Sequence, residues 1–370
     1  MTRNDTLRTG FTTGTAAAAG AKAATLVLGG QKIPRQVDIS LPNGDRMRIP
    51  IQECGRDEGG ISCTVIKDGG DDPDATHLAR ITAAVAPGSE DQDNDEIHIC
   101  GGPGVGLVTR PGLPVPVGQA AINPVPRTQI RLAVEEAQQA TGLSGPLQVT
   151  ISVADGEKMA RKTFNPRLGI TGGISILGTR GTVRPYSHQA YRDTITACLD
   201  AARAQDEAWV ALCTGGRSER YMRTLHPILP QSACVLVADF LAFSLQEAVQ
   251  RKFSRITYAC FFGKLVKAAQ GHPYTHARKC SIDFQALASW VREAGLSSTK
   301  AGEIQACNTA RQALDIIRTT PDSRPVIRAV ADRALSSLQD FAGRTRGLDL
   351  AVFDDQGELV IELSPEISES

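Results

Sequence analysis

The sequence has no net charge, because 40 basic side chains balance 40 acidic ones. A balanced chain sets up no long-range field that would gather nucleic acid or an anionic membrane, so we expect neither as a partner. Long hydrophobic runs are also missing. The most apolar stretch near the N-terminus, residues 16–28, is interrupted by Lys22 and is too short to span a bilayer. These absences predict a soluble, cytoplasmic protein.

Signatures of metal centres and redox motifs are absent as well. The six histidines show no H-E-x-x-H or other ligand spacing, so no protein-bound metal is expected. The nine cysteines include no C-x-x-C pair and are odd in number, and Cys213, Cys234 and Cys260 lie in apolar, strand-like runs. We therefore expect reduced cysteines that pack as small buried side chains.

Residues 101–127 lack any helical or strand period, because twelve of them are Gly or Pro. A connection of this length is uncommon inside a compact domain unless it is a disordered linker or an ordered wall of a binding site. Its low charge and its apolar side chains argue against a solvated linker. We interpret the segment as an ordered loop around a ligand.

A chain of 370 residues exceeds the size at which one core usually stops growing, so two domains are expected, with a border near residue 184. Residues 1–184 read as a mixed α+β domain that carries Gly/Pro-rich substrate loops. Its expected elements are a helix over 14–28, a hairpin around Asn43-Gly44, strands over 61–67, 96–100 and 147–153, and a helix over 127–141.

Residues 185–370 alternate apolar strands with helices, which predicts a parallel sheet covered on both faces. We expect a Rossmann-like α/β domain with a helical C-terminal extension. The predicted strands are 209–214, 233–239 and 255–262, the predicted helices are 187–206, 218–229, 241–253 and 263–269, and three helices over 283–345 precede a closing hairpin over 350–363.

The strand ends of this second domain suggest a ligand site. Gly215 and Gly216 follow its first strand, and open parallel sheets bind ligands beyond such ends. Asp239 ends the next strand, at a spacing typical of an acidic side chain that meets a ribose, and Gly263-Lys264 end the third. The arrangement suits an adenosine-containing cofactor. It lacks G-x-G-x-x-G, however, and the alternative interpretation is a set of tight turns with a solvated lysine.

The segment from Lys67 to His77 concentrates four carboxylates, Asp68, Asp71, Asp72 and Asp74. It is not a calcium loop, because the glutamate needed at the twelfth position is missing. One interpretation is a turn whose Asp side chains bond local N–H groups and cap a helix. The other is catalytic, with Asp71, Asp72 and His77 as candidates for proton transfer. Asp68 and His276 are weaker candidates for the same role.

Several arginines fall in or beside Gly/Pro-rich loops, where a guanidinium can hold a ligand carboxylate through paired hydrogen bonds. They are Arg110, Arg127, Arg167, Arg180 and Arg184. Asn123 and Asn165 precede prolines in similar settings and are either architectural or part of the same site. Arginines on several loops predict a ligand with several carboxylates.

Five segments resemble the C-1 methyltransferase family that acts on cobalt-precorrin-5B in anaerobic cobalamin biosynthesis. The segments are GFTTGTAAAAGAKAA, KDGGDDPDATH, GGPGVGLVTRPGLPVPVGQAAINPVPR, FNPRLGITGGISILGTRGTVRPYS and FGKLVKAAQG. The likeness covers residues 8 to about 280. It implies methyl transfer from S-adenosylmethionine to a cobalt-containing tetrapyrrole, giving cobalt-precorrin-6A. The cobalt would arrive with the substrate, and the many carboxylates of the tetrapyrrole would pair with the loop arginines.

With this resemblance, we expect the tetrapyrrole at Thr12, Thr13, Arg110, Asn123, Arg127, Asn165, Arg167 and Arg184. We expect S-adenosylmethionine at Gly215, Gly216, Asp239, Gly263 and Lys264. A non-catalytic carrier of the tetrapyrrole is the alternative, and a nucleotide-dependent enzyme with an unrelated substrate is a third interpretation. The oligomeric state stays open, a homo-oligomer included.

The chain departs from the family pattern at a few positions. Ala16 stands where the family usually has Cys, which argues against a catalytic thiol there. The usual strand-end segment T-P-G-N-Y-G-E is C-T-G-G-R-S-E here, with Arg217 and Ser218. Asp239 replaces an Asn, and N-T-H-S is replaced by residues 274–277, which begin with Tyr274. These changes fall in the presumed cofactor domain.

Overall fold

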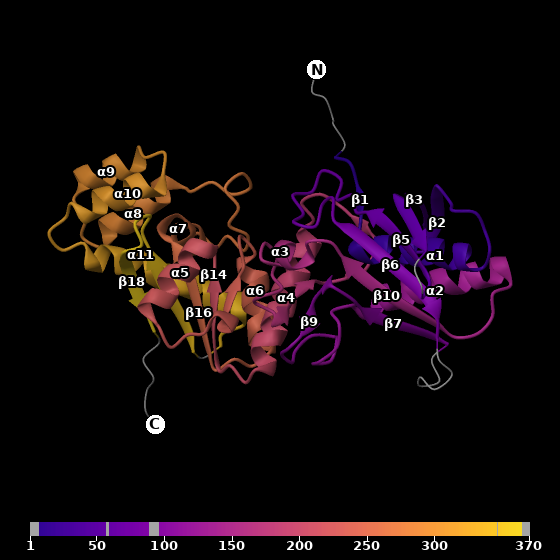
Figure 1. Cartoon of the computed structure of the whole chain (residues 1–370). Helices are drawn as coiled ribbons and strands as arrows, with labels where there is room; N and C mark the ends of the chain where they lie inside the picture. Colours follow the sequence, from indigo (N-terminus) through magenta and orange to yellow (C-terminus); the bar gives the residue numbers. More distant parts are fainter. Residues whose placement is uncertain (1–6, 57–58, 89–95, 346, 365–370) are drawn as a thin grey trace, which may run out of the picture. The chain divides into compact units, whose positions relative to one another are not determined.

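The computed structural model describes residues 7–56, 59–88, 96–345 and 347–364. The chain forms two compact units, residues 1–188 and 189–370, each with its own sheet (Figure 1). The sequence places this border near residue 184. None of the helices in the described part of the chain combines the length and the apolar character that a membrane crossing needs.

The first unit is built on a five-stranded sheet in the order β4-β5-β6-β10-β7. Neighbouring strands are antiparallel, except that β10 and β7 are parallel. The strands are β4 (Glu53–Arg56), β5 (Ile61–Ile66), β6 (Arg80–Pro87), β10 (Leu147–Val153) and β7 (Ile97–Gly101), and the helices of the unit are α1 (Thr13–Leu28), α2 (Pro124–Thr141) and α3 (Gly156–Ala160).

Shorter strand pairs complete this unit. The predicted hairpin is confirmed: β2 (Gln36–Ser40) pairs with β3 (Arg46–Pro50), and Gly44 in the turn has a φ of 89°. Three further pairs are β1 (Gly10–Phe11) with β13 (Thr182–Val183), β8 (Gly104–Val105) with β12 (Gly173–Ile174), and β9 (Leu107–Val108) with β11 (Ile170–Thr171). The predictions for strands β5, β7 and β10 and for helices α1 and α2 are also confirmed.

The expectation that no strand runs within residues 101–127 is wrong, although the segment is ordered. β8 and β9 lie inside it, and α2 begins at Pro124, three residues before the predicted start. The Gly and Pro content hides these strands because each pairs for only two residues with the glycine-rich segment 170–174. A strand this short has no alternating pattern that a sequence could reveal.

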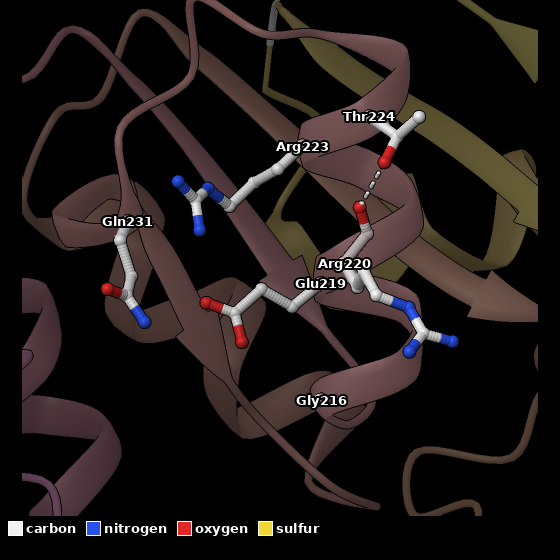
Figure 2. A pocket seen from close by; sticks show the side chains of 6 residues that line it. All are labelled: Gly216, Glu219, Arg220, Arg223, Thr224 and Gln231. Atoms are coloured by element: carbon white, nitrogen blue, oxygen red, sulfur yellow. Dashed lines mark hydrogen bonds between the residues drawn. The ribbon is translucent and has the colours of Figure 1, made fainter.

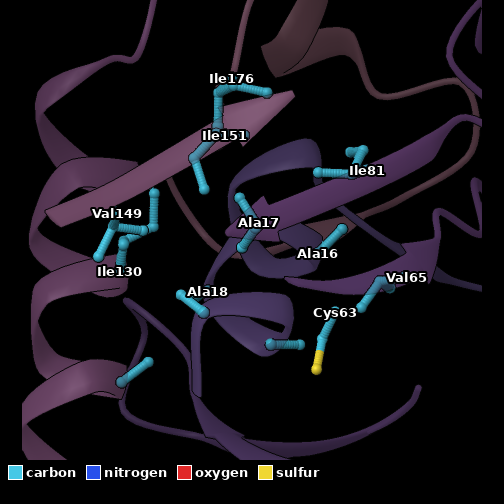
Figure 3. Packing of buried hydrophobic residues seen from close by; sticks show 14 of the residues in the cluster. Ala16, Ala17, Ala18, Cys63, Val65, Ile81, Ile130, Val149, Ile151 and Ile176 are labelled. Atoms are coloured by element: carbon cyan, nitrogen blue, oxygen red, sulfur yellow. The ribbon is translucent and has the colours of Figure 1, made fainter. Parts of the chain in front are cut away.

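The alanine run of α1 is explained by its packing on the sheet. α1 contacts α2 and strands β5 and β6, and its alanines are buried in the core of the unit. A Cβ added at Gly20 would lie 3.0 Å from the Cys63 carbonyl oxygen and 3.2 Å from the Ala83 Cβ. The helix therefore approaches the sheet too closely for larger side chains. Figure 3 shows Ala16, Ala17 and Ala18 beside the isoleucines and valines of the sheet.

The expectation that all cysteines are reduced is wrong for two of them. Cys54 and Cys63 form a disulfide between neighbouring strands β4 and β5. They lie directly opposite each other in the antiparallel register, a relation that the sequence spacing of nine residues does not reveal. Cys213, Cys234 and Cys260 are free and buried, as predicted.

The second unit contains a five-stranded sheet in the order β15-β14-β16-β17-β18. Its strands are β14 (Trp209–Cys213), β15 (Cys234–Leu236), β16 (Arg255–Phe261), β17 (Leu348–Phe353) and β18 (Leu359–Leu363). The first four are mutually parallel, and β18 returns antiparallel to β17 as the predicted hairpin. Numbered in chain order the sheet is 2-1-3-4-5, which is a doubly wound order other than the 3-2-1-4-5-6 order of the dinucleotide-binding Rossmann fold. The structure shows a mixed α/β unit.

Helices cover both faces of this sheet. The helices and the short η1 are α4 (His188–Ala204), α5 (Gly216–Leu225), η1 (Gln231–Ala233), α6 (Leu241–Gln250), α7 (Phe262–Ala269), α8 (Phe284–Glu293), α9 (Ser298–Gln305), α10 (Ala310–Arg318) and α11 (Arg324–Ala342). α5 packs through Met222 on the face that presents Ala211 and Ala259, whereas α6, α7 and α11 pack together on the other face.

Two predicted helix boundaries in this unit are wrong. Residues 283–345 form four helices and not three, because Asp283, Ser297 and Thr309 each cap a new helix with a side-chain oxygen. α5 ends at Leu225 and does not reach residue 229. Pro227 disfavours helical backbone at His226 and cannot donate the helical hydrogen bond itself.

Candidate functional site

The carboxyl ends of β14, β15, β16 and β17 meet at one edge of the second sheet, because these strands are parallel. β14 lies between β15, which follows it in sequence, and β16, so the strand order reverses between β14 and β16. Ligands bind at such reversals in open α/β sheets. The structure thus brings the predicted residues Gly215, Gly216, Asp239, Gly263 and Lys264 to one edge.

Gly215 and Gly216 connect β14 to α5 without a steric reason to be glycine. A Cβ added at either position meets no atom within 4 Å among the described residues, and neither backbone adopts a left-handed conformation. The Gly215 amide donates to Ser218 Oγ at 3.0 Å, which closes the turn. Since the chain itself tolerates side chains here, the free space suits a ligand that approaches the backbone closely.

Asp239 and Lys264 form an ion pair at this edge, with 3.1 Å between Lys264 Nζ and Asp239 Oδ1. Lys264 Nζ also donates to the Ala238 carbonyl oxygen at 2.6 Å. Thr275 donates its hydroxyl to Asp239 Oδ1 at 3.3 Å and its amide to the Asp239 carbonyl at 3.0 Å. Asp239 is therefore held by Lys264 of α7 and by Thr275. At Gly263, an added Cβ would lie 3.3 Å from the Ala310 Cβ, so a larger residue would be crowded there.

Four further residues surround Asp239: Tyr274 and His276, which the sequence analysis named, and Phe240 and Lys267, which it did not. Phe240 and Tyr274 lie with ring centroids 5.2 Å apart, and Tyr274 stacks on His276 at 6.0 Å. Burial and the neighbouring Asp239 carboxylate raise the pKa of Tyr274, and the Arg192 guanidinium opposes them. Lys267 is buried and donates to the Thr275 carbonyl at 3.0 Å. Lys267 is the second lysine of the FGKLVKAAQG segment, and its place in that motif is the sequence signal that could have identified it.

A Tyr258→Phe variant is expected to raise the free energy of unfolding by about 1 kcal/mol. The Tyr258 side chain is 1% exposed, and its hydroxyl lacks a hydrogen-bond partner in the described part of the chain. The nearby Thr275 hydroxyl is used by Asp239. Burial, with smaller contributions from Cys260 and Asp239 and a weak opposing one from Thr275, holds the pKa of Tyr258 well above its ordinary value, so the phenol stays neutral. Urea unfolding measures the change.

Tyr221→Phe is the control for that measurement, because the Tyr221 hydroxyl accepts from Arg220 Nη2 at 3.3 Å and gains nothing from removal. A loss of stability in Tyr258→Phe would show that the hydroxyl is paired in solution.

Cys260 lies on the same strand as Tyr258, and burial raises the pKa of its thiol to about 12. Cys260 is therefore protonated and unsuited to act as a nucleophile.

A pocket of about 330 Å³ opens along α5, next to the strand-end glycines. Its lining residues are Gly216, Glu219, Arg220, Arg223, Thr224 and Gln231 (Figure 2). Apart from Gly216, none of them was predicted. Glu219 and Arg223 are four residues apart on a helix that follows a strand and two glycines, which is the signal that could have found them. Gln231 comes from η1 and carries no such signal.

In the first unit, the acidic segment is tied to its neighbours. Asp71 Oδ2 accepts from the Arg8 amide at 2.6 Å, and Asp72 Oδ1 accepts from the Tyr186 amide at 2.9 Å. His77 Nδ1 accepts from the Gly69 amide at 3.0 Å. A hydrogen bond from the Arg8 guanidinium holds the pKa of Asp68 below its ordinary value. Asp71 and Asp72 thus lie in one turn and His77 in the next, where His77 Nδ1 is 3.8 Å from Asp68 Oδ1.

Thr12 and Thr13 are buried at the start of α1, where their hydroxyls serve the fold. Thr12 caps the helix by accepting from the Thr15 amide at 3.2 Å. Thr13 Oγ1 donates to the carbonyl oxygens of Ser175 and Leu177 and accepts from the Leu177 amide at 2.8 Å. The GFTTGT motif therefore anchors the glycine-rich segment 173–181 to the helix.

The predicted asparagines and Arg127 also have partners within the chain. Asn165 is buried; its Nδ2 donates to the Gly173 carbonyl at 3.0 Å, and its Oδ1 accepts from Ser175 Oγ at 3.1 Å. Arg127 donates through Nε to the Ile122 carbonyl at 3.0 Å and through Nη1 to the Ile99 carbonyl at 3.1 Å. Asn123 is the N-terminal cap residue of α2; its amide donates to the Ile176 carbonyl at 3.0 Å, and its side chain makes no capping hydrogen bond.

The remaining predicted arginines lie in two places. Arg110 is exposed, and its side chain passes over Gly169, two residues beyond the half-buried Arg167. Arg180 and Arg184 are exposed on either side of β13, next to the segment that holds Asp72. Exposed large apolar side chains lie on the same loops, at Leu107, Val117, Leu177 and Tyr186. Guanidinium groups and apolar side chains on adjoining loops suit a large ring with peripheral carboxylates.

Comparison with known proteins identifies the family of this chain. The profile of the CbiD family matches residues 1–185, and a second profile, described as the CbiD C-terminal domain, matches residues 274–362. A cobalt-precorrin-5B C(1)-methyltransferase from Nitratidesulfovibrio vulgaris is 46% identical over 363 residues, which covers 95% of this chain and 91% of that protein. The chain belongs to the CbiD family.

Other relatives carry the same name. Proteins from Geobacillus kaustophilus and Salinispora arenicola are 44% and 42% identical; they cover 86% and 97% of this CbiD chain, and the matches span 84% and 93% of those proteins. A solved structure of a cobalamin biosynthesis protein (CbiD) from Archaeoglobus fulgidus is 28% identical, covers 70% of this chain and 79% of that one, and has a TM-score of 0.40.

Three residues at which this CbiD chain departs from the family pattern, Ala16, Asp239 and Tyr274, can be placed in the structure. Ala16 is fully buried in the core of the first unit, so a side chain at this position faces packing atoms and not a ligand. Asp239 and Tyr274 lie close together at the same corner, where the carboxylate pairs with Lys264. A carboxylate here balances the lysine charge, which an amide could not do.

Proposed function

We propose that this chain is an enzyme that transfers a methyl group from S-adenosylmethionine to C-1 of cobalt-precorrin-5B in anaerobic cobalamin biosynthesis, giving cobalt-precorrin-6A. The observation that carries the proposal is the membership in the CbiD family, with methyltransferase relatives 40–46% identical over most of the chain. The cobalt is part of the substrate.

The second unit is proposed to hold S-adenosylmethionine in a Rossmann-like manner. The fit rests on the open space at Gly215 and Gly216, which a Cβ would fill. Asp239, Gly263 and Lys264 would line the same edge and hold the adenosine part. When bound, the sulfonium supplies an activated methyl group. The protein's own contribution is to fix the relative position of the reactants and exclude water, which accounts for about 7–11 kcal/mol of the barrier in well-oriented reactions.

The first unit is proposed to hold the tetrapyrrole through arginines and exposed apolar side chains of its Gly/Pro-rich loops. Arg110, Arg167 and Arg184 would bind acetate and propionate groups. Thr12, Thr13, Asn123, Arg127 and Asn165 would act by fixing these loops, as their bonds to backbone groups suggest. Asp71, Asp72 and His77 stay candidates for proton transfer, because they lie in consecutive turns of one segment and Asp72 accepts from the amide of Tyr186, two residues after Arg184.

The deciding experiment combines the purified protein, S-adenosylmethionine and anaerobically prepared cobalt-precorrin-5B. The proposal expects a product that is heavier by one methyl group, together with S-adenosylhomocysteine. Mass spectrometry of both products measures the outcome. A protein that binds the tetrapyrrole but neither binds S-adenosylmethionine nor methylates would instead be the non-catalytic carrier.

An Arg184→Ala variant is expected to weaken tetrapyrrole binding by about 1.5–3 kcal/mol, because one charged hydrogen bond to a substrate carboxylate is lost. S-adenosylmethionine affinity and the melting temperature should not change, since Arg184 is exposed and lies in the first unit. Arg35→Ala, another exposed arginine of this unit, is the matched control. Fluorescence titration that finds equal tetrapyrrole affinity in both variants would reject Arg184 as a substrate contact.

A further inference from the structure

Tyr258 places a buried phenol next to the Asp239 corner of the second unit. It lies on β16, where the neighbouring Ala259 packs against α5, so the Tyr258 side chain points to the opposite face of the sheet, which α6 and α7 cover. The side chain is 1% exposed, and its hydroxyl has no hydrogen-bond partner among the described residues. An unpaired buried hydroxyl costs stability, so its presence at a ligand edge calls for an explanation.

Two polar side chains lie close to this phenol. Burial is the main reason for the raised pKa of Tyr258; Cys260 and the Asp239 carboxylate raise it further, and Thr275 opposes them. The Thr275 hydroxyl donates to Asp239 Oδ1 at 3.3 Å, which is longer than the usual O–H···O bond of about 2.8 Å. A hydroxyl has one proton and two lone pairs. Thr275 can therefore accept from Tyr258 while it donates to Asp239.

The backbone around Asp239 is strained and held in place. Ala238 adopts a left-handed conformation with a φ of 46°, which is uncommon for a residue with a Cβ, and its carbonyl accepts from Lys264 Nζ at 2.6 Å. The Thr275 amide donates to the Asp239 carbonyl at 3.0 Å, and the buried Lys267 donates to the Thr275 carbonyl at 3.0 Å. Backbone strain that the surrounding structure maintains is typical of ligand sites.

We propose that Tyr258 is a positioning residue for the methyl donor: when a ribose hydroxyl of the donor binds Asp239, the phenol donates to the Thr275 hydroxyl, which donates in turn to Asp239. The inference rests on the proposed function and deepens it. A small closure of Thr275 toward Asp239 and β16 shortens the long bond and pairs the phenol. The protons of this chain all point the same way, so its members strengthen one another. A donor favours the closed arrangement because it meets a firmly held carboxylate.

Isothermal titration of Tyr258→Phe with S-adenosylhomocysteine tests this role. Affinity is expected to fall by about tenfold, because the bound state loses a hydrogen bond that the free state does not have. The melting temperature should not fall, since the free protein loses only an unpaired hydroxyl. A phenol with a merely structural role would not weaken binding in a variant that is at least as stable as wild type. Tyr221→Phe is the matched control and should bind as wild type does, because the Tyr221 hydroxyl accepts from Arg220.

Two variants of Thr275 test whether Tyr258 acts through this residue. Thr275→Ser keeps the hydroxyl and should bind S-adenosylhomocysteine within about twofold of wild type, whereas Thr275→Val should bind it more weakly. In the Thr275→Val background, Tyr258→Phe should change the affinity by less than about twofold, as coupling between the two side chains requires. Thermal unfolding of each variant separates loss of fold from loss of contact.

Two results would overturn the inference alone. One is wild-type affinity in Tyr258→Phe, and the other is an equal loss from Tyr258→Phe with threonine or valine at position 275. A wild-type protein that binds neither S-adenosylmethionine nor S-adenosylhomocysteine, with or without the tetrapyrrole, would reject the proposed donor and this inference with it.

Discussion

A Gly216→Val variant is expected to fold with nearly wild-type stability and to lose methyl transfer by at least about 100-fold. Gly216 begins α5, its backbone is not left-handed, and a Cβ there meets no atom within 4 Å in the described chain. The isolated protein thus tolerates a side chain, and valine has a higher helix propensity than glycine. A donor that approaches the backbone at this point would be displaced by the branched side chain, and small displacements of a reacting group reduce rates strongly.

Gly302→Val is the control for this experiment. Gly302 is also helical, exposed and surrounded by open space in the structure, but it lies on α9, away from the strand ends. Melting temperatures of the two variants should agree with wild type, while S-adenosylmethionine affinity and turnover should fall only in Gly216→Val. If Gly216→Val kept its affinity within about twofold, the donor would not approach this turn and the cofactor assignment would have to move.

The strands and helices of the second unit were accessible from sequence because each apolar run is bounded by its own stop signal. Gly215-Gly216 ends β14, and Pro227 explains why α5 stops at Leu225. The four C-terminal helices were harder to separate, since their caps Ser297 and Thr309 are common surface residues. The strand order depends on which strands meet in space, and no local pattern states it.

Contacts between distant segments explain what the sequence did not predict. The Cys54–Cys63 disulfide depends on the register of two strands, and the pocket along α5 is lined in part by Gln231 from a separate segment. Thr13 and Asn165 could be identified as notable from their motifs. Their bonds to the carbonyls of Leu177 and Gly173 became visible only when the glycine-rich segment was placed against them. Motif recognition thus located the important loops, and packing distinguished the residues that support them from those that face outward.

An Asp74→Ala variant is expected to lower the free energy of unfolding by about 3–5 kcal/mol, because it leaves a buried ammonium without its counter-charge. Lys67 is 1% exposed, and its Nζ pairs with Asp74 Oδ2. Asp74 Oδ1 also accepts from the amide and the hydroxyl of Thr76, each at 2.7 Å. Removing the carboxylate therefore disrupts the turns that carry Asp71, Asp72 and His77, and tetrapyrrole methylation should fall with the stability. Urea unfolding measures the first effect.

Two further variants separate the ion pair from the turn. Asp74→Asn keeps an oxygen for Thr76 but loses the charge, so most of the destabilisation should remain. Lys67→Met combined with Asp74→Asn removes both charges and should recover much of it, since apolar replacement of a buried pair is often neutral. A double variant as unstable as Asp74→Asn alone would show that the uncompensated charge of Lys67 is not the source of the lost stability.

The pH dependence of the unfolding free energy also separates the contribution of the Lys67–Asp74 ion pair from that of the turn. Burial raises the pKa of Asp74, but the Lys67 charge and the hydrogen bonds from Lys67 and Thr76 outweigh it, and the net pKa lies below the ordinary value. A carboxyl with a lowered pKa stabilises the fold fully above its unfolded pKa of about 3.9 and loses this contribution as the pH falls through its folded pKa. Wild-type stability should therefore decline more steeply below about pH 4 than that of the double variant, which has no charge to lose.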